Sequence, residues 1–533
     1  MTIHTQSSAS SPQPSLADAV FDYAGKNPER VALASEYGEI SYRELAEHVR
    51  RVGTALQCSG VKAGDRVAVL TTPRADAYAI FVALNAIGAI WVGINPVYQY
   101  REMEYVVRDS APVALIFLSD FQGRDFAPDA QKLMAECECL QATYCLNRSL
   151  PNFISVDQLV EEDKPAGSTV PLERQGDSIA MIVYTSGSTG EPKGCMLANK
   201  AMAYRAKVQY EQYPVSGYPR VYCPLPLNHV GGMQMVAAAA LFNGGTVNFR
   251  EKFDPSSVGK VVAKCKVNYI ILFPTMYQLI CDDPAFNNDD FTSLEIVNFA
   301  GGTIAKELLM KLLKMGSGDV RTCFGSTETC IGVIFSEAGL DPDTLAISVG
   351  RPIADDVRIM GKGGKECRVG EVGEFQVIRD YCMSGYFNRP EATAEAFTDD
   401  GYVKTGDLVE ELPDGNFRFV ARISDMFKSG GYNVYPREVE IAIEEHPDVV
   451  AAAVVGVPHP LYSEVGYAFV LREPDSALTE EEVRVLCKAG LANFKVPKTI
   501  ELVDAFPLLP NGKMDRTRLR GIAIDKCKTD SGD

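Results

Sequence analysis

A run of small and polar residues, TSGSTGEPKG, follows a short apolar segment at residues 180–184. Its three glycines allow a tight loop whose successive N–H groups can point at one anion. Hydroxyl groups add further donors and a lysine adds a positive charge, as a polyphosphate requires. The alternative is a Ser/Gly-rich surface loop without a ligand, which the same composition also produces. The residues that would hold phosphate are Thr185, Ser186, Gly187, Ser188, Thr189, Gly190 and Lys193.

This loop is not the common P-loop. In the G-x-x-x-x-G-K-[ST] spacing the second glycine is replaced here by Pro192, and Gly194 follows the lysine. Its position directly after a strand nevertheless matches the geometry that phosphates prefer. We therefore favour the phosphate interpretation over the bare surface loop.

Four further segments carry groups suited to nucleotide chemistry. In CFGSTETC, Thr327 and Glu328 follow a glycine, and this carboxylate could hold Mg²⁺ already bound to phosphates. In YVKTGDL, Asp407 could accept two hydrogen bonds from ribose hydroxyls. Each residue alone also has a structural interpretation as a turn former, a helix-start acid or a solvated charge. The other two segments are ARISDMFKSGGYNVYPREVE, with Arg422, Lys428, Gly430 and Gly431, and PLLPNGKMDR, with Lys513.

Alternating helix and strand patterns must position these groups. Capped amphipathic helices are predicted in SLADAVFDYAGKNPERVAL and in ISYRELAEHVRRVGTALQCSG, the second ending at Gly60. Strands alternating with helices predict a mainly parallel sheet with helices on its faces, an α/β fold. The predicted strands are residues 65–70, 114–118, 180–184, 246–249, 269–273 and 295–302.

One apolar run, from Tyr78 to Ile94, is close to the length that spans a membrane. Asn85 and Gly88 interrupt it, and no Lys or Arg flanks its C-terminal end. We predict a buried helix that turns at Gly88 into a buried strand, and no stable membrane insertion.

The sequence pattern changes after about residue 345, where Gly-rich turns and short alternating strands predict a small β-rich unit. A second change lies near Arg422. From Glu438 onward a compact αβ pattern follows, including a helix in TEEEVRVLCKAGL that begins at a capping motif. The last hundred or so residues are therefore predicted to form a separate small domain.

Composition excludes several classes of protein. The 52 basic and 70 acidic residues give a net charge of −18, which argues against coating nucleic acid or an anionic membrane. Fourteen scattered cysteines contain no Cys-x-x-Cys pair and favour reduced, mostly buried thiols in a cytoplasmic protein. The first fourteen residues have no basic start and no apolar core, so we interpret them as a disordered lead-in rather than a signal or anchor.

In order and content, the five segments resemble the adenylate-forming superfamily of acyl- and aryl-CoA synthetases, firefly luciferase and peptide-synthetase adenylation domains. The resemblance runs from about Ser15 to Arg520 and is strongest to the acyl-CoA synthetases. It implies a large N-terminal domain at 15–423, built of parallel αβ layers plus the small β-rich unit. A small, mobile α+β C-terminal domain at 424–533 would follow.

The resemblance also implies the reaction. A carboxylate attacks the α-phosphate of ATP, releasing pyrophosphate, and a thiol then displaces AMP from the acyl-adenylate. By position, the Thr185–Lys193 loop looks like the one that holds the β- and γ-phosphates. Thr327 resembles the α-phosphate contact and Glu328 the Mg²⁺ ligand. Asp407 and Arg422 resemble the residues that contact the ribose and the phosphate. Gly301, Gly302 and Phe324 resemble those of the adenine site.

The remaining catalytic residues follow from the same resemblance. Lys513 looks like the lysine that bridges carboxylate and α-phosphate in the first step. Lys428 and Gly431 would face the site after a domain rotation, with Gly431 lining the thiol tunnel. His229 resembles a gate between acyl pocket and tunnel; from its position alone, a hydrogen-bonded core histidine is an equal alternative. A catalytic base is less expected at His229, because a thiol with a pKa near 8.5 needs little help to lose its proton.

Three positions depart from the family pattern. Phe324 stands where Tyr is usual, Ala421 replaces a Gly, and Ser424 lies at the hinge where Asp or Lys is usual. The Phe324 ring can still stack on adenine, but the hydroxyl contact of a tyrosine is lost. The direction in which Ser424 shifts the two domain arrangements stays open.

The substrate class follows from the segment after His229, MQMVAAAALF, which contains no acid to bind an ammonium group. We therefore expect a hydrophobic carboxylic acid rather than an amino acid, with ATP, Mg²⁺ and CoA as the other reactants. Loading of a carrier protein stays open, as does a homodimer. A kinase, an ATPase or a non-catalytic nucleotide-binding protein would leave Lys513 unexplained.

Overall fold

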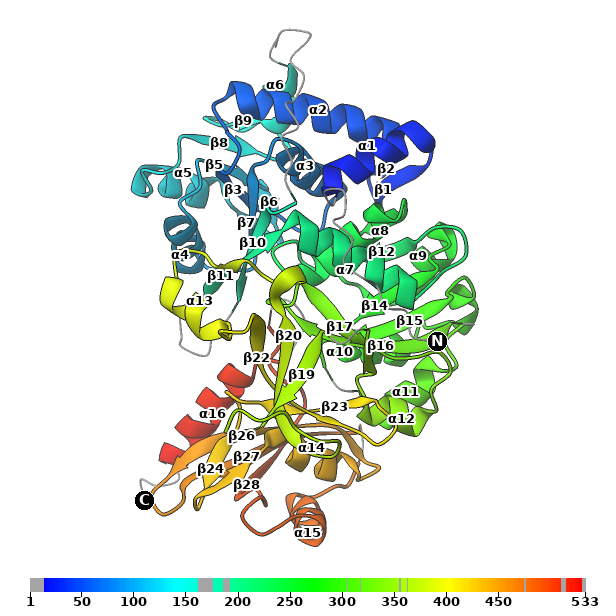
Figure 1. Cartoon of the computed structure of the whole chain (residues 1–533), viewed down its shortest axis with the longest axis vertical. Coiled ribbons are helices and arrows are strands. Elements are labelled where there is room, and N and C mark those ends of the chain that lie inside the picture. Colours follow the sequence, from blue (N-terminus) through cyan, green and yellow to red (C-terminus); the bar gives the residue numbers. More distant parts are fainter. Residues whose placement is uncertain are drawn as a thin grey trace.

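The computed structural model describes residues 14–161, 176–185, 192–302, 304–316, 318–353, 356–361, 363–473, 476–509 and 514–529. It is an α/β fold with a large N-terminal domain and a smaller C-terminal one (Figure 1). Of the predicted lead-in, residues 1–13 lie outside the described residues. Ser15 caps the first helix, its hydroxyl accepting from the Asp18 N–H at 3.2 Å.

The first large sheet has nine strands with a parallel centre and antiparallel edges. In spatial order they are β18 (Arg351–Pro352), β17 (Ile331–Phe335), β16 (Asp319–Ser326), β15 (Ile296–Ala300), β14 (Tyr269–Leu272), β12 (Arg220–Cys223), β13 (Thr246–Phe249), β1 (Val31–Ser35) and β2 (Gly38–Ser41).

The second large sheet has eight strands and is also mixed. Its order is β21 (Gly385–Tyr386), β11 (Lys193–Ala198), β10 (Ile179–Thr185), β4 (Ile90–Ile94), β3 (Arg66–Leu70), β5 (Ala114–Phe117), β8 (Ala142–Cys145) and β9 (Ile154–Ser155). The strand segments predicted from the sequence are confirmed within a residue or two. The antiparallel edges were not predicted, because tertiary pairing decides them rather than local pattern.

The helices of the large domain pack against these two sheets (Figure 1). They are α1 (Leu16–Lys26), α2 (Tyr42–Cys58), α3 (Ala75–Ala86), α4 (Tyr100–Ser110), α5 (Ala127–Glu136), α6 (Val156–Glu161), α7 (Asn199–Gln212), the π-helix η1 (Gly231–Ala238), α8 (Ala239–Phe242), α9 (Pro255–Cys265), α10 (Pro274–Asp282), α11 (Lys306–Leu312), α12 (Pro342–Ile347) and α13 (Pro390–Ala396). Short pieces complete the domain: β6 (Asp120–Phe121), β7 (Arg124–Asp125), and the 3₁₀ turns Asn288–Phe291 and Arg379–Tyr381.

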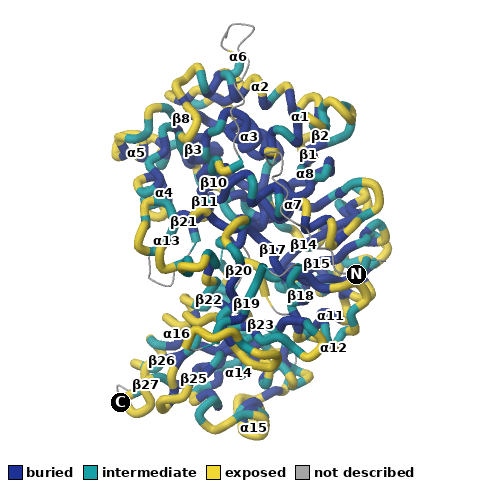
Figure 2. The backbone as a smooth tube through the Cα atoms, in the orientation of Figure 1, coloured by how far each residue is buried: buried dark blue, intermediate teal, exposed yellow. Residues whose placement is uncertain are grey.

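Helix α3 explains the apolar run of the sequence. It is buried on all sides except at Asp76 and turns at Gly88, φ +73°, into the buried strand β4 (Figure 2). Asn85, which interrupts the run, accepts from the Ala17 N–H at 3.1 Å and donates to Asn199 at 2.8 Å. The predicted buried helix and strand are confirmed. Among the described residues, no helix has both the length and the apolar character needed to cross a bilayer.

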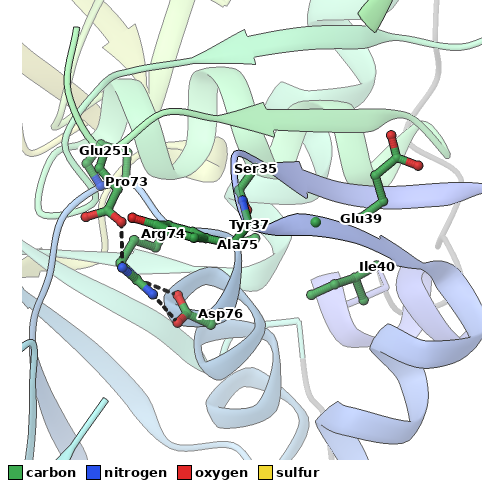
Figure 3. A pocket seen from close by; sticks show the side chains of 10 residues that line it. Ser35, Tyr37, Glu39, Ile40, Pro73, Arg74, Ala75, Asp76 and Glu251 are labelled. Atoms are coloured by element: carbon green, nitrogen blue, oxygen red, sulfur yellow. Dashed lines mark hydrogen bonds and ion pairs between the residues drawn. The ribbon is translucent and has the colours of Figure 1, made fainter. Parts of the chain in front are cut away.

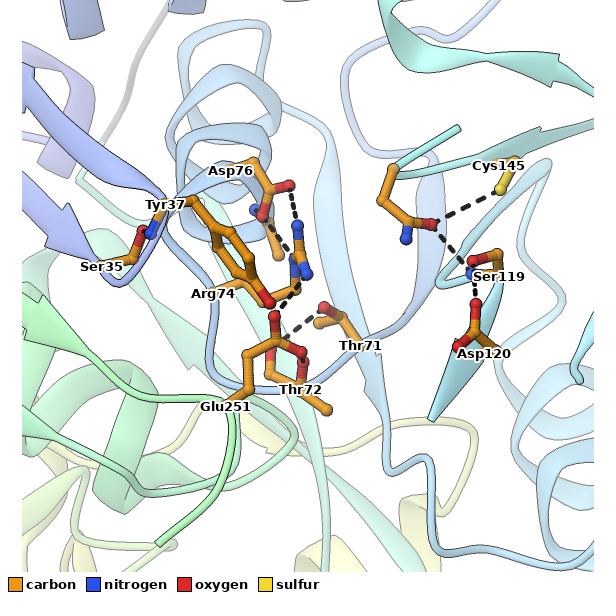
Figure 4. Close-up of polar contacts among 12 residues, drawn as sticks. Ser35, Tyr37, Thr71, Thr72, Arg74, Asp76, Ser119, Asp120, Cys145 and Glu251 are labelled. Carbon is orange, nitrogen blue, oxygen red and sulfur yellow. Dashed lines mark hydrogen bonds and ion pairs between the residues drawn. The ribbon is translucent and has the colours of Figure 1, made fainter. Parts of the chain in front are cut away.

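An ion-pair network ties the two large sheets together beyond the ends of β3 and β13. Arg74 donates to Glu251 at 2.5 Å and to both oxygens of Asp76 at 2.8 and 2.9 Å (Figure 4). Thr72 donates to the second oxygen of Glu251 at 2.9 Å. The Tyr37 ring covers the guanidinium at 5.1 Å and forms one wall of a shallow pocket of about 200 Å³ (Figure 3). The network fixes how the sheets sit relative to one another.

The β-rich unit is a four-stranded antiparallel sheet, β19 (Val357–Met360), β20 (Val372–Ile378), β22 (Tyr402–Glu411) and β23 (Phe417–Arg422). The small domain follows with a five-stranded sheet and three helices. These are β24 (Phe427–Ser429), β25 (Tyr432–Val434), α14 (Pro436–Glu444), β26 (Val449–His459), β27 (Ser463–Arg472), α15 (Glu480–Gly490), β28 (Thr499–Val503) and α16 (Arg516–Thr529). The predicted cap of α15 is a capping box between Thr479 and Glu482.

All fourteen cysteines lie among the described residues, and none forms a disulfide. Eight of them are buried. Burial raises the pKa of the Cys223 and Cys323 thiols to about 12. The prediction of mostly buried thiols is confirmed.

Candidate active site

The glycine-rich loop joins two antiparallel strands. Thr185 at the end of β10 pairs with Lys193 at the start of β11, and its hydroxyl donates to the Lys193 carbonyl at 3.4 Å. Because the chain continues into a strand, the analogy with phosphate sites at helix N-termini does not apply to this loop. Ser186, Gly187, Ser188, Thr189 and Gly190 lie outside the described residues.

Helix α4 anchors both stems of this loop. The Tyr184 hydroxyl donates to Asp109 at 2.7 Å, and Arg389 donates to the other oxygen of Asp109 at 2.7 Å. One helical turn away, the Tyr105 hydroxyl donates to the Pro192 carbonyl at 2.8 Å. Burial, and then the bond to Asp109, raise the pKa of Tyr184, so its phenol stays a donor. The loop therefore starts and ends at fixed points.

Thr327 and Glu328 lie in a strained turn between β16 and β17. Gly325 permits it, because a Cβ there would lie 2.1 Å from the Ile331 carbonyl oxygen. Cys330 has φ +55° and Ile331 has φ +85°, a conformation that β-branched residues avoid. Such strain persists only where the surroundings impose it, and it clusters at functional sites.

A buried arginine stabilises the same turn from behind. Arg205 on α7 is 2% exposed and donates to the Thr329 carbonyl at 3.2 Å and to the Cys382 thiol at 3.9 Å. The buried Cys195 thiol lies 3.7 Å from the Thr327 carbonyl. Sequence reasoning missed Arg205, because it is one of three cations in a mixed helix and no periodic signal marks it as buried.

Tyr386 connects two of the predicted site residues and was also missed. Its hydroxyl donates to Glu328 Oε1 at 3.1 Å, and the Lys193 ammonium lies 5.3 Å from its ring centroid. Burial, followed by the nearby Glu328 carboxylate, raises the pKa of Tyr386, which keeps the phenol protonated. The signal was present in the sequence as SGYF, but no spacing linked it to the glycine-rich loop.

The donor set at Glu328 fits a magnesium ion delivered on phosphates. Glu328 is half-buried, and its Oε2 receives no hydrogen bond from the described residues. Within the same described part of the chain, no group of three His, Cys, Asp or Glu forms a dedicated metal cage. Mg²⁺ bound through one carboxylate plus substrate phosphates needs no such cage.

Asp407 and Arg422 pair across β22 and β23. Asp407 is 2% exposed, and its Oδ1 lies 3.1 Å from Arg422 Nε. Gly406, with φ +70°, precedes it in the strand. Asp407 first, and Glu328 among the weaker influences, raise the pKa of Arg422. These charges therefore share one electrostatic environment.

Gly301, Gly302 and Phe324 lie at the ends of neighbouring parallel strands. Both glycines are exposed after β15, and Gly301 has φ +75°. Phe324 on β16 is half-buried, with its ring 5.9 Å from Phe375 and 5.7 Å from Phe419. The β-rich unit thus holds the ring near the C-terminal end of β16.

His229 is half-exposed between β12 and the π-helix η1. Its Nδ1 accepts the Gly231 N–H at 3.0 Å, so the neutral ring carries its proton on Nε2. That tautomer presents a donor rather than a base at Nε2. Gly93 allows the close approach of this loop to β4, since a Cβ there would lie 2.5 Å from the Asn228 Cα.

The π-helix that follows His229 is buried and apolar apart from Gln234, which donates to the Met202 carbonyl at 2.8 Å. π-Helical segments are rare and concentrate at functional sites. Gln209 of α7 donates to the Met235 carbonyl at 2.9 Å and fixes the segment from outside.

The small-domain candidates lie on an exposed hairpin. Lys428 on β24 is exposed, and the turn contains Gly430 with φ +59° and Gly431 with φ +87°. Within the described residues, no hydrogen bond or ion pair joins the Lys428 side chain to the large-domain candidates. Ser424 is exposed between β23 and β24. Lys513 lies outside the described residues.

Comparison with known proteins gives one consistent family. The model described as "AMP-binding enzyme" matches residues 20–387, and "AMP-binding enzyme C-terminal domain" matches residues 438–513. A feruloyl-CoA synthase of an Amycolatopsis species is 32% identical over 93% of this chain and 96% of its own length. An indoleacetate–CoA ligase of Aromatoleum aromaticum is 29% identical over 96% of this chain and 98% of its own. The crystal structure of ATP-bound MatB from Rhodopseudomonas palustris superposes with a TM-score of 0.86 at 26% identity, covering 96% of this chain and 99% of that one.

Proposed function

The chain belongs to the AMP-binding enzyme family, and we propose that it joins a hydrophobic carboxylic acid to CoA through an acyl-adenylate. Its relatives are CoA ligases, which supports an ATP-dependent, AMP-forming reaction. The observation that carries the proposal is that Tyr386 lies between Lys193 and Glu328. The Glu328 carboxylate in turn influences Arg422, which pairs with Asp407 across β22 and β23.

In the first step the acid's carboxylate attacks the α-phosphorus of ATP and pyrophosphate leaves. This displacement needs positioning and charge neutralisation more than covalent help. Lys193, with the Thr185–Gly190 loop, binds the β- and γ-phosphates, and Thr327 contacts the α-phosphate. Glu328 would hold Mg²⁺, which supplies charge neutralisation when bound. Asp407 accepts from the ribose hydroxyls, while Gly301, Gly302 and Phe324 form the adenine site.

Lys513 would bring its ammonium between the two anions, the carboxylate and the α-phosphate. In the second step the CoA thiol attacks the acyl carbon, the C–S bond forms and AMP leaves with the anhydride oxygen. Lys428 and Gly431 serve this step, with Gly431 lining the thiol's path and His229 gating the acyl pocket. The chain would rotate about Ser424 between the steps, with domains at 15–423 and 424–533.

The substrate class is supported by the apolar wall of η1 and by relatives named for aryl acids. Pyrophosphate exchange should be measured with a panel of fatty, aryl and polycyclic acids. We expect exchange to depend on a hydrophobic acid, and acid-independent phosphate release would contradict the ligase assignment. Free CoA and a phosphopantetheine carrier protein should then be compared as thiols, and we expect free CoA to be used.

The boundary at Ser424 has its own test. Limited proteolysis should cut within residues 421–430, and a non-hydrolysable acyl-adenylate analogue should change the rate. Cleavage that avoids this segment, or that no ligand alters, would contradict a hinge here.

A further inference from the structure

Tyr386 is held rigidly between two oppositely charged side chains. Its strand β21 pairs with β11 through Cys195, and its backbone N–H donates to the Thr393 hydroxyl at 2.9 Å. The preceding Gly385 has φ +140°, and a Cβ there would lie 2.7 Å from Thr393 Cγ2. The backbone therefore determines where this ring sits.

The hydroxyl of Tyr386 orients one carboxylate. It donates to Glu328 Oε1 at 3.1 Å, and a hydrogen bond to an ionised acceptor is stronger than one between neutral groups. The carbonyl of Glu328 is held as well, accepting from the Met383 N–H at 2.7 Å. With one oxygen used in this way, Oε2 receives no hydrogen bond from any described residue.

The ring of Tyr386 separates that carboxylate from a lysine. The Lys193 ammonium lies 5.3 Å from the ring centroid, within range of a cation–π interaction. In the described structure Lys193 and Glu328 form no ion pair with each other. Without the ring, the two opposite charges could approach and pair, and each would neutralise the group that the nucleotide needs.

We propose that Tyr386 is a positioning residue of the adenylation step, orienting Glu328 toward magnesium and preventing Lys193 from pairing with it. This inference rests on the proposed function, because it assigns the triphosphate to Lys193 and the metal to Glu328. Tyr386 itself touches neither reacting atom.

Two substitutions separate the roles of the hydroxyl and the ring. Tyr386→Phe keeps the ring and removes only the bond to Glu328, so magnesium affinity should fall about tenfold, as for other groups that orient a metal ligand. Tyr386→Leu removes both, so nucleotide binding without metal should also weaken as Lys193 turns toward Glu328. Tyr381→Phe is the matched control, because the Tyr381 ring stacks on Tyr204 at 3.7 Å in the same segment.

Calorimetric binding of a non-hydrolysable ATP analogue should be measured with and without Mg²⁺, in the absence of acid and CoA. We expect Tyr386→Phe to match wild type in EDTA and to need about ten times more Mg²⁺ for half-saturation. In a Glu328→Gln background, Tyr386→Phe should change neither the affinity in EDTA nor the Mg²⁺ concentration at half-saturation. Equal magnesium dependence in Tyr386→Phe, Tyr381→Phe and wild type would overturn the inference, and so would an equal loss in EDTA and in Mg²⁺.

The binding measurement does not use catalysis, so it separates this inference from the proposed function. If wild type binds the analogue with Mg²⁺ but shows no acid-dependent exchange, the ligase assignment fails while the role of Tyr386 stands on its binding data. If exchange is normal and Tyr386→Phe keeps wild-type magnesium dependence, only the inference fails.

Discussion

The large-domain charges around Tyr386 and the small-domain hairpin at Lys428–Gly431 are built in opposite ways. Lys193 and Glu328 lie at strand ends of two different sheets and are joined through one tyrosine. Lys428 is exposed on a two-stranded hairpin, with its backbone N–H donating to Glu464 at 3.3 Å. The proposed triphosphate site would benefit from fixed charges, whereas residues proposed to serve only one step can lie on an element that moves in and out.

The largest effect should come from separating the two half-reactions. Lys513→Ala should abolish pyrophosphate exchange, because its charge offsets a repulsion between anions that exists only during adenylation. The same variant should still convert a synthetic acyl-AMP and CoA to product. Gly431→Leu should do the reverse, obstructing the thiol without touching ATP.

The backbone at Gly431 provides a control for that experiment. With φ +87° any side chain there is strained, yet a Cβ would meet no atom within 4 Å. Gly431→Ala imposes the same strain without the bulk, so the difference between Leu and Ala measures obstruction of the tunnel. Equal loss of both half-reactions in folded Lys513→Ala and Gly431→Leu would contradict a division of labour between the two regions.

The second prediction concerns how the small domain holds the chain near Lys513. Glu440 on α14 is 1% exposed and forms an ion pair with Arg516 at 2.7 Å. It also accepts hydrogen bonds from Arg516 at 3.0 Å and from the Val454 N–H at 2.9 Å. Glu440→Gln removes the buried counter-charge of the half-buried Arg516 guanidinium and should lower the free energy of unfolding by about 3–5 kcal/mol. Hydrogen exchange of α14 and β26 in the full chain measures this locally.

The same carboxylate predicts a pH dependence. Burial opposes ionisation of Glu440, but Arg516 and Arg437 outweigh it, and the pKa of Glu440 lies below its ordinary 4.5. A lowered pKa means that the stabilisation is present above about pH 4.5 and is lost as the pH falls through the folded value. Glu438→Gln on the same helix is the control. Glu438 forms a surface pair with Lys495, so the free energy of unfolding should fall by less than about 1 kcal/mol. Equal losses of hydrogen-exchange protection in Glu440→Gln and Glu438→Gln would contradict a stabilising role for the buried Glu440–Arg516 pair.

The third prediction tests the fixed charges directly. Lys193→Ala and Glu328→Ala should each lose about 2–4 kcal/mol of transition-state stabilisation in pyrophosphate exchange, the usual effect of one preorganised group. Lys200→Ala is the control, because Lys200 pairs with Asp177 on the surface at 2.5 Å. Unchanged kcat/KM for ATP in both site variants would remove the phosphate assignment.

The smallest predicted effect compares matched helix caps in the two domains. Ser41 begins α2 and Thr479 begins α15, each with a capping box to a glutamate three residues on. Ser41→Ala and Thr479→Ala should each lower the free energy of unfolding by about 1 kcal/mol. We expect hydrogen-exchange protection to fall only in the domain that carries the substitution. If either change lowers protection in both, the two regions unfold as one unit.

Local pattern was enough to predict most elements. Asn85 and Gly88 located the turn from α3 to β4, and the Thr479–Glu482 box located α15. The antiparallel β10–β11 hairpin, with Thr185 opposite Lys193, was not predicted, because a loop of this composition can lead into a strand or a helix. Tyr386 was missed for a different reason: its role depends on contacts with residues 193 and 328, which only the fold brings close.

The π-helix η1 has a consequence for how acid preference can change. Its hydrogen bonds close one residue later than those of an α-helix, so it contains the equivalent of an inserted residue. Deleting one residue between Gly231 and Ala238 would let the backbone return to α-helical register. Residues before and after the segment would keep their side-chain directions, whereas those inside it would change neighbours as the wide turns close. The proposed acyl pocket, which η1 would line, can therefore be reshaped by a change in chain length alone, a route to new specificity in which no surviving side chain is substituted.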